Sequence, residues 1–91
     1  MVARMYKIEL VKTCGACPEQ YDAYFNGDQV GYLRLRHGTF RVDYGFCGGD
    51  TIITEYPEGD GCFEEDEREY YLDLACQAIM DEMIKRGHTD V

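Results

Sequence analysis

The sequence Val30-Gly-Tyr-Leu-Arg-Leu-Arg-His-Gly-Thr-Phe-Arg-Val-Asp-Tyr44 decides the fold, because it holds two alternating segments around the dipeptide His37-Gly38. Alternation of apolar and polar side chains is the pattern of strands that bury one face. A two-residue turn at His37-Gly38 joins such strands as a hairpin and sets their register. The predicted cross-strand pairs are Leu35 with Phe40 and Leu33 with Val42 on the buried face, and Arg34 with Arg41, Tyr32 with Asp43 and Arg36 with Thr39 on the other face.

Three more segments have the composition of strands, and turn signals separate them. In Met5–Lys12 the apolar residues Tyr6, Ile8 and Leu10 alternate with charged ones. Asn26-Gly27-Asp28 predicts a second hairpin turn, because Asn and Gly tolerate positive φ. The five predicted strands are Met5–Lys12, Tyr21–Phe25, Val30–Arg36, Thr39–Tyr44 and Thr51–Tyr56.

From about Phe63 to Arg86 the apolar spacing changes to that of an α-helix. The acidic residues of 64–67 would lie in its first turn and Lys85 in its last, where both complement the helix dipole. The predicted core stripe is Leu72, Cys76, Ile79 and Met83, with Ala75, Met80 and Ile84 beside it. The predicted fold class is therefore α+β: a five-stranded antiparallel meander packed against one long C-terminal helix, as a single domain over residues 1–91 with 87–91 as a loose tail.

Charge is unevenly distributed along this chain of 91 residues, whose net charge is −9. Thirteen of its eighteen acidic residues lie in 43–82, where the only basic residue is Arg68. Such an excess of negative charge repels phosphate backbones, which argues against direct binding of nucleic acid or of anionic membranes. The chain shows no apolar run of membrane-spanning length and no signal peptide, so we expect a cytoplasmic protein.

The five cysteines are an odd number, which favours reduced thiols over a disulfide framework. Cys14-Gly-Ala-Cys17 has the spacing of a zinc knuckle, and Cys47 and Cys62 lie in glycine-rich loops that could supply two more ligands. The second pair lacks the knuckle spacing. A structural zinc site at Cys14, Cys17, Cys47 and Cys62 is therefore kept as an alternative, and no other cofactor is predicted.

An arginine-rich face follows from the hairpin register. Arg34 opposite Arg41 places like charges on neighbouring strands, which is destabilising unless something compensates it. One interpretation is a set of salt bridges with Asp43 or Asp22 as counter-ions. The other is a site for a carboxylate or phosphate, because guanidinium groups bind these anions through two parallel hydrogen bonds. The predicted anion-binding residues are Tyr32, Arg34, Arg36 and Arg41.

Acidic residues are densest just before and at the start of the predicted helix. Such a run is often only a solvated surface. The functional alternative is a negative ridge that occupies a basic surface on a partner protein. The predicted partner-binding residues are Glu58, Asp60, Glu64, Glu65, Asp66, Glu67 and Glu69. Catalysis has little support, since His37 and His88 have no Ser, Cys or Asp at a recognisable offset, and we predict a protein without enzymatic activity.

Two segments carry a resemblance to known proteins. Gly31-Tyr-Leu-Arg-Leu-Arg-His-Gly-Thr-Phe-Arg-Val-Asp-Tyr44 and Gly59-Asp-Gly-Cys-Phe-Glu-Glu-Asp-Glu-Arg-Glu-Tyr-Tyr-Leu72 resemble parts of short uncharacterised proteins of phages and mobile elements of gut Firmicutes. The resemblance implies a viral, anti-defence setting inside a host cell and assigns no chemistry. Small proteins in that setting often block a host factor or sequester a host signal.

Two functional hypotheses follow. In the first, the protein is an inhibitor that engages a basic host protein through the acidic ridge. In the second, the arginine face binds a small anionic ligand or a nucleotide signal, and a homodimer that pairs two such faces would deepen the site. The sequence leaves the oligomeric state and the identity of the partner open.

Overall fold

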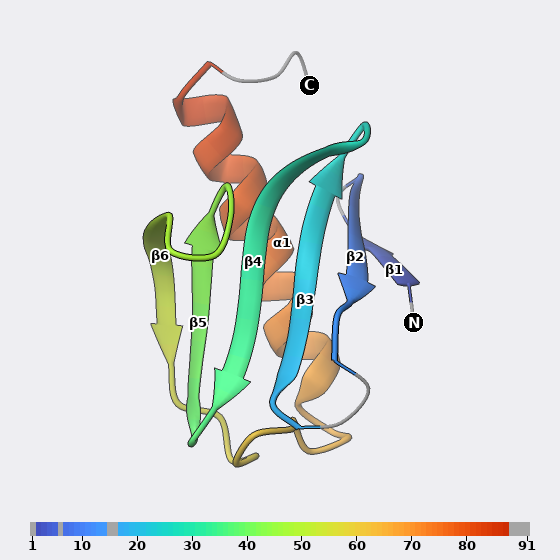
Figure 1. The fold of residues 1–91 in the computed structure, drawn as a ribbon, viewed down its shortest axis with the longest axis vertical. Coiled ribbons are helices and arrows are strands. Elements are labelled where there is room, and N and C mark those ends of the chain that lie inside the picture. The colour runs from blue at the N-terminus through green and yellow to red at the C-terminus, as the bar shows by residue number, and fades with distance from the viewer. Residues whose placement is uncertain (1, 6, 15–16, 88–91) are drawn as a thin grey trace.

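The computed structural model describes residues 2–5, 7–14 and 17–87, which form one antiparallel sheet with a helix against it (Figure 1). Each strand pairs with the next one along the chain, so that β1 and β6 are the two edges. The elements are β1 (Val2–Met5), β2 (Ile8–Lys12), β3 (Glu19–Phe25), β4 (Asp28–Arg36), β5 (Thr39–Tyr44), β6 (Asp50–Glu55) and α1 (Arg68–Lys85).

The predicted α+β class is confirmed, and the five predicted strands are present as β2 to β6. A further strand, β1, precedes them because the predicted strand Met5–Lys12 breaks at Lys7, which has a φ of 65°. The chain reverses there, and Met5 pairs with Ile8. Tyr6, predicted to be buried, lies outside the described residues, as do residues 88–91 of the predicted tail.

The register of the central hairpin is confirmed pair by pair. Leu35 lies opposite Phe40, and Arg34 lies opposite Arg41. The turn residues His37 and Gly38 have φ values of 53° and 76°, the left-handed conformation that a tight hairpin turn requires. The turn at 26–27 has the same left-handed form. The alternation of the sequence therefore predicts which side chains occupy each face of the sheet.

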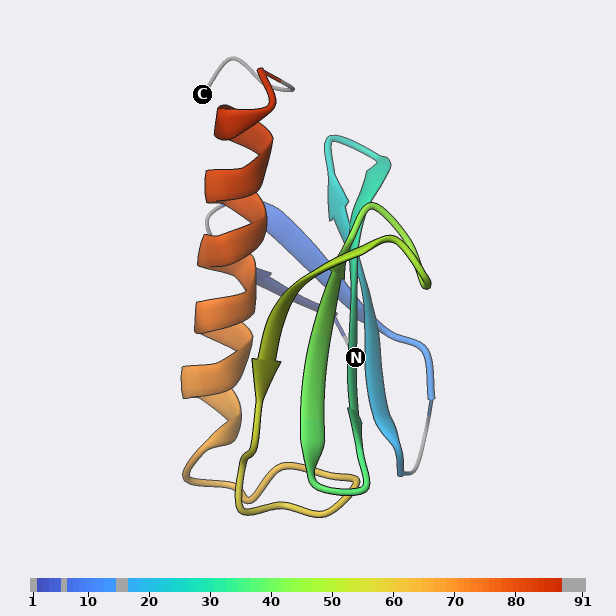
Figure 2. The same ribbon diagram turned by 90° about the vertical axis from the view of Figure 1, so that its left-hand side faces the viewer.

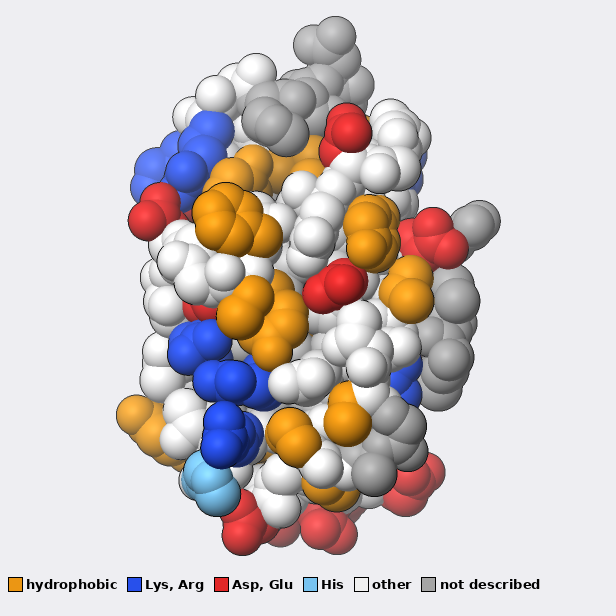
Figure 3. Space-filling view, viewed as in Figure 1, with side chains coloured by type: hydrophobic (Ala, Val, Ile, Leu, Met, Phe, Trp, Pro, Cys, Tyr) orange, Lys and Arg blue, Asp and Glu red, His pale blue; other side chains and the backbone are white. Residues whose placement is uncertain are grey.

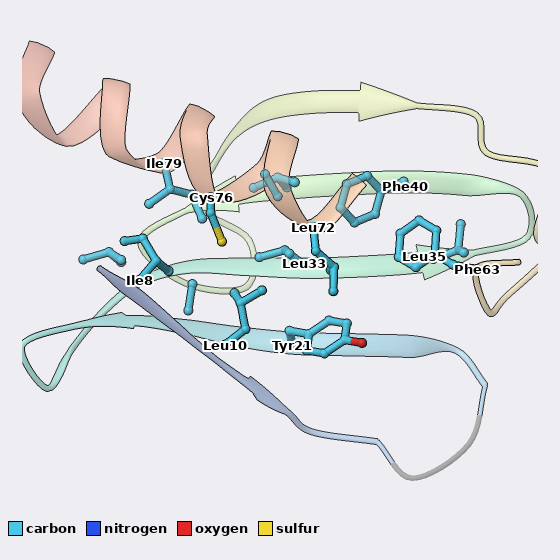
Figure 4. Close-up of a cluster of buried hydrophobic side chains, with 14 of the residues drawn as sticks. Ile8, Leu10, Tyr21, Leu33, Leu35, Phe40, Phe63, Leu72, Cys76 and Ile79 are labelled. Carbon is cyan, nitrogen blue, oxygen red and sulfur yellow. The ribbon is translucent and has the colours of Figure 1, made fainter. Parts of the chain in front are cut away.

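The core lies between α1 and one face of the sheet, as Figures 2 and 4 show. The fully buried side chains come from both layers, and those of the helix lie one turn apart on one face. They include Leu72, Ala75, Cys76, Ile79 and Met83 from α1, and Ile8, Leu10, Tyr21, Leu33, Leu35, Phe40 and Val42 from the strands. Ile84, predicted to lie beside this stripe, is instead 52% exposed.

Gly31 marks the closest approach of helix to sheet. A Cβ atom at this position would lie 2.5 Å from the Cδ1 of Ile79, which is closer than two carbon atoms can pack. Glycine therefore lets Ile79 rest directly on the backbone of β4. This contact positions α1 across the middle of one face of the sheet.

The helix begins at Arg68, later than the predicted start near Phe63. Residues 65–67 form a turn ahead of it, so the acidic residues of 64–67 are not in its first helical turn. The carboxylate of Glu67 instead accepts backbone hydrogen bonds from Glu58, Gly59 and Glu64, at 2.9, 2.8 and 2.9 Å. Glu67 thus ties the loop after β6 to the start of α1.

Candidate functional site

The outer face of the sheet gathers the basic side chains of the central hairpin. Figure 3 shows a stripe of Lys and Arg over the lower parts of β4 and β5, with a histidine at the turn below it. The two strands place Arg34 beside Arg41, because these residues are direct cross-strand partners. A shallow depression of about 360 Å³ lies among these side chains. Its lining residues are Arg34, Arg36, His37, Thr39 and Arg41.

Asp43 is the counter-ion of this face, as one of the two interpretations predicts. It is only 1% exposed, and its Oδ1 lies 3.1 Å from the Nε of Arg41. Its carboxylate also accepts hydrogen bonds from the Gly48 N–H at 3.0 Å and from the Thr51 hydroxyl at 2.8 Å. Asp43 is therefore fixed by three groups, and it in turn holds the guanidinium of Arg41 against the sheet.

The remaining cations of the face are less well neutralised by carboxylates. Within the part of the chain that the structure describes, neither Arg34 nor Arg36 lies in a salt bridge, and Asp22 pairs with neither. Arg34 is half-buried and Arg36 is exposed. The face thus carries two guanidinium groups beyond the one that Asp43 neutralises, and these are the groups that a bound anion would meet.

Tyr32 has a supporting position rather than the predicted ligand-binding one. Its side chain is buried, and its hydroxyl donates a hydrogen bond to the Oε1 of Gln20 at 3.0 Å. Burial raises the pKa of Tyr32, so its hydroxyl stays protonated at neutral pH. The hydroxyl of Tyr32 is therefore already engaged within the protein.

A second depression adjoins the first at the turn between β4 and β5. It has a volume of about 350 Å³ and shares Arg36 and His37 with the first. Its other lining residues are Cys17, Pro18, Asp60 and Gly61. The predicted ridge residue Asp60 therefore lies at the border of the arginine face. Positive and negative surfaces meet at this end of the molecule.

The predicted acidic ridge divides into two groups. Glu67 is occupied by the backbone amides described above, and Glu65 pairs with Arg68 at 2.6 Å. The hydrogen bonds to Glu67 outweigh the effect of burial, which acts to raise its pKa, and leave that pKa lowered. The others are exposed and lie in no salt bridge within the described ranges. These five are Glu58, Asp60, Glu64, Asp66 and Glu69.

A buried carboxylate that the sequence reasoning missed lies beneath the ridge. Glu19 is 1% exposed and accepts hydrogen bonds from the Tyr21 hydroxyl at 2.5 Å, the Phe63 N–H at 3.0 Å and the Nε of Arg68 at 2.9 Å. Burial acts to raise the pKa of Glu19, but these partners outweigh it and lower that pKa. The alternation along β3 is a sequence signal for this burial, because Glu19, Tyr21 and Ala23 are spaced two residues apart and share the buried face.

The expectation that the cysteines are all reduced is wrong. Cys17 and Cys62 form a disulfide, with their Cα atoms 5.5 Å apart. The predicted zinc set is therefore not available as four thiolates, and the described residues hold no group of three or more metal-binding side chains. Cys14 is half-buried and Cys47 is exposed. Burial raises the pKa of the core residue Cys76 to about 12, so its thiol stays protonated.

Comparison of the chain with models of protein families, with curated proteins and with solved structures finds no match. Among the described residues, no helix has the length and apolar character needed to cross a membrane. The function must therefore be argued from the surfaces themselves. Two surfaces stand out. The first is the arginine face, which consists of Arg34, Arg36 and Arg41 with His37 at the adjoining turn. The second is the group of five exposed carboxylates of the acidic ridge.

Proposed function

We propose that the protein is a non-enzymatic binding module whose arginine face binds the carboxylate or phosphate groups of a small anionic ligand, such as a nucleotide. The observation that supports this is the pairing of Arg34 with Arg41 at a depression where, among the described residues, Arg41 has a buried counter-ion and Arg34 lies in no salt bridge. Opposed like charges on adjacent strands are destabilising. A bound anion would reduce the repulsion between Arg34 and Arg41, and this relief would favour binding.

The geometry suits an anion more than a cation or an apolar ligand. Guanidinium groups present several N–H donors in one plane and match the two oxygens of a carboxylate or phosphate. Asp43 lies 3.1 Å from the Nε of Arg41, and the Arg41 side chain remains 34% exposed. The neighbouring hydroxyl of Thr39 adds a donor at the same depression. The net charge of −9 repels large polyanions, so a small ligand fits better than a nucleic acid.

Thermal-shift measurements against nucleotides, cyclic dinucleotides and polycarboxylates test this function. We expect a rise in melting temperature with at least one class. Calorimetric titration of that ligand should then show binding that is about tenfold weaker in Arg34→Ala, the loss expected from one charge-assisted contact. Lys85→Ala is the matched control, because it removes the same charge from an exposed position on α1. Equal weakening in both variants, or a flat screen, would contradict a specific arginine site.

A second candidate function is favoured by the five exposed carboxylates of the acidic ridge. In this candidate the protein is a phage- or mobile-element-type inhibitor that meets a basic surface of a host protein in the cytoplasm. Glu58→Lys, Glu64→Lys and Asp66→Lys together should abolish capture of that partner, whereas Asp81→Lys on the outer side of α1 should not. The triple variant spares Glu67 and Glu65, so the loop contacts remain. Capture that survives the triple variant would exclude the ridge.

A further inference from the structure

The strand β6 forms an edge of the sheet with one side unpaired. It bonds to β5, and the order of the described strands places none beyond it. In Figure 1 it lies at the left border of the sheet, with α1 behind the sheet. An edge strand exposes a row of backbone N–H and C=O groups to which another extended chain can add. The direction of each group along β6 follows from the register.

In a two-residue hairpin the pair that flanks the turn, here Arg36 and Thr39, exchanges both of its backbone hydrogen bonds. Hydrogen-bonded and non-hydrogen-bonded pairs then alternate along the ladder. Thr39 and Arg41 therefore direct their backbone groups toward β4, and Phe40 directs its own toward β6. Thr54 is the β6 partner of Arg41. Its N–H and C=O consequently point away from β5, toward the open edge.

Negative charge surrounds the lower end of this edge on the side that faces α1. Glu55 is the partner of the core residue Phe40 and therefore lies on the helix side of β6. Burial raises the pKa of Tyr71, and the negative charge of Glu67, Glu55 and Glu58 also acts to raise it. Arg41, the cross-strand partner of Thr54, lies on the opposite face of the sheet.

Exposed aromatic rings occur in the segments that adjoin this edge. Tyr56, the residue after β6, is 73% exposed. Tyr70, in the first turn of α1, is 65% exposed and packs edge-to-face on Tyr71 with ring centroids 5.0 Å apart. Exposed tyrosines supply contact area at low entropic cost and attract cations to their faces. An acidic and aromatic surface beside an open strand edge is suited to a basic extended peptide.

We propose that β6 binds an extended basic segment of a partner protein by strand addition, with lysine or arginine at alternate positions directed toward the helix side. This proposal rests on the second candidate function and adds the mode of binding. Backbone hydrogen bonds at the edge would give the affinity, and the carboxylates would select the charge of alternate side chains. A second copy of this chain is a poorer occupant, because each copy carries a net charge of −9 and the Glu55 side chains would repel.

The test uses a fluorescently labelled peptide of alternating lysine and valine, with a control peptide of the same composition whose lysines are grouped at one end. We expect the alternating peptide to bind about tenfold more tightly than the grouped one. Thr54→Pro removes the outward N–H without removing a bond to β5 and should cost about tenfold in affinity. Thr54→Val keeps the N–H and should bind as the parent does.

Hydrogen exchange gives a readout that does not depend on the proline variant remaining folded. Addition of the alternating peptide to the unmodified protein should slow exchange at the Thr54 amide and leave the Ile53 amide, which faces β5, unchanged. Equal binding of the two peptides without protection of Thr54 would overturn strand addition, while the acidic ridge could still attract a basic partner. Protection of Thr54 that grows with protein concentration in the absence of peptide would identify a second copy as the occupant and overturn the proposal.

Discussion

Two arginines of this protein lie against buried carboxylates, and the two sites are built differently. Arg68, at the start of α1, bonds to both oxygens of Glu19, and that carboxylate is also held by two further protein donors. Arg41, on the outer face, meets Asp43 through its Nε. The first site joins the sheet to the helix and is saturated by the protein's own groups. The second leaves guanidinium groups in excess.

The difference separates charge that maintains the fold from charge that the proposed function assigns to a ligand. Around Arg68 the carboxylates of Glu19 and Glu65 outnumber the cation, so no further anion is required. On the arginine face, Asp43 is the buried carboxylate that pairs with Arg41, and among the described residues neither Arg34 nor Arg36 lies in a salt bridge. Substitutions at the two sites should therefore change the free energy of unfolding in opposite directions.

The largest expected effect is at Glu19. Glu19→Ala leaves Arg68 without its buried partner and leaves the Phe63 N–H unbonded, so it should lower the free energy of unfolding by about 3–5 kcal/mol. Glu65→Ala removes an exposed partner from the same arginine and should cost less than about 1 kcal/mol. Urea denaturation of both variants at pH 7 measures the two values. Similar losses would show that Arg68 is not anchored by Glu19.

Loss of the contact between helix and sheet should have the next largest effect. Ile79 is fully buried against Gly31, and Ile79→Ala should cost about 2–5 kcal/mol, enough to unfold much of a small domain at 37 °C. Asp81→Ala, at an exposed position of α1, should change little. Circular dichroism melts compare the two. An Ile79→Ala variant that melts within a degree or two of the parent would mean that α1 does not pack on the sheet as described.

These two predictions differ in how far the sequence anticipates them. The role of Ile79 follows from helical spacing alone, and the hairpin register follows from alternation around His37-Gly38. Glu19 was missed because its partner Arg68 is far away in the sequence, and no local pattern joins them. The late helix start was missed for a similar reason, since Glu67 binds the backbone of Glu58 and Gly59 instead of capping a helix that begins at Phe63.

The candidate site was anticipated in part. Alternation places Arg34 opposite Arg41, and the same register puts Asp43 on their face. It does not reveal that Tyr32 is covered or that the loop at Gly48 closes over Asp43, because both depend on how the loop after β5 folds. The disulfide was missed because pairing of cysteines 45 residues apart depends on the tertiary structure.

The disulfide lies at the end of the molecule where the Glu19 site and the arginine face adjoin. It joins the connection before β3 to the loop before α1, beside the Glu19 site. Replacement of both Cys17 and Cys62 by serine should lower the free energy of unfolding by about 2–4 kcal/mol, because the unfolded chain regains the freedom of a long loop. Cys47→Ser should have little effect. Urea denaturation checks this, and equal stability of the double variant and the parent would contradict it.

Acid should weaken the Glu19 site selectively. The pKa of Glu19 is lowered in the folded protein, so its contribution to stability is complete above the ordinary glutamate pKa of about 4.3 and is lost as the pH falls from there through the folded pKa. Urea midpoints measured from neutral to acidic pH should therefore fall more steeply in the parent than in Glu19→Gln. Parallel curves would show that other carboxylates dominate acid unfolding.

The smallest expected effect has the opposite sign and lies on the arginine face. Arg34 and Arg41 are opposed like charges, and such a pair on a sheet is destabilising by about 0.2–1 kcal/mol. Arg34→Gln keeps the length of the side chain and removes the charge, so it should raise the free energy of unfolding by about that amount in dilute sodium chloride. At about 1 M salt the gain should vanish, because the screening length falls to about 3 Å.

Arg86→Gln is the control, since Arg86 pairs with Asp50 and Glu82 and its loss should not stabilise the protein. Chloride is the appropriate salt, because the proposed function predicts that phosphate or sulfate would bind the arginine face and hide the repulsion. An Arg34→Gln variant less stable than the parent in dilute chloride would mean that Arg34 stabilises the fold, and the arginine face would then be structural in the same sense as the Glu19 site.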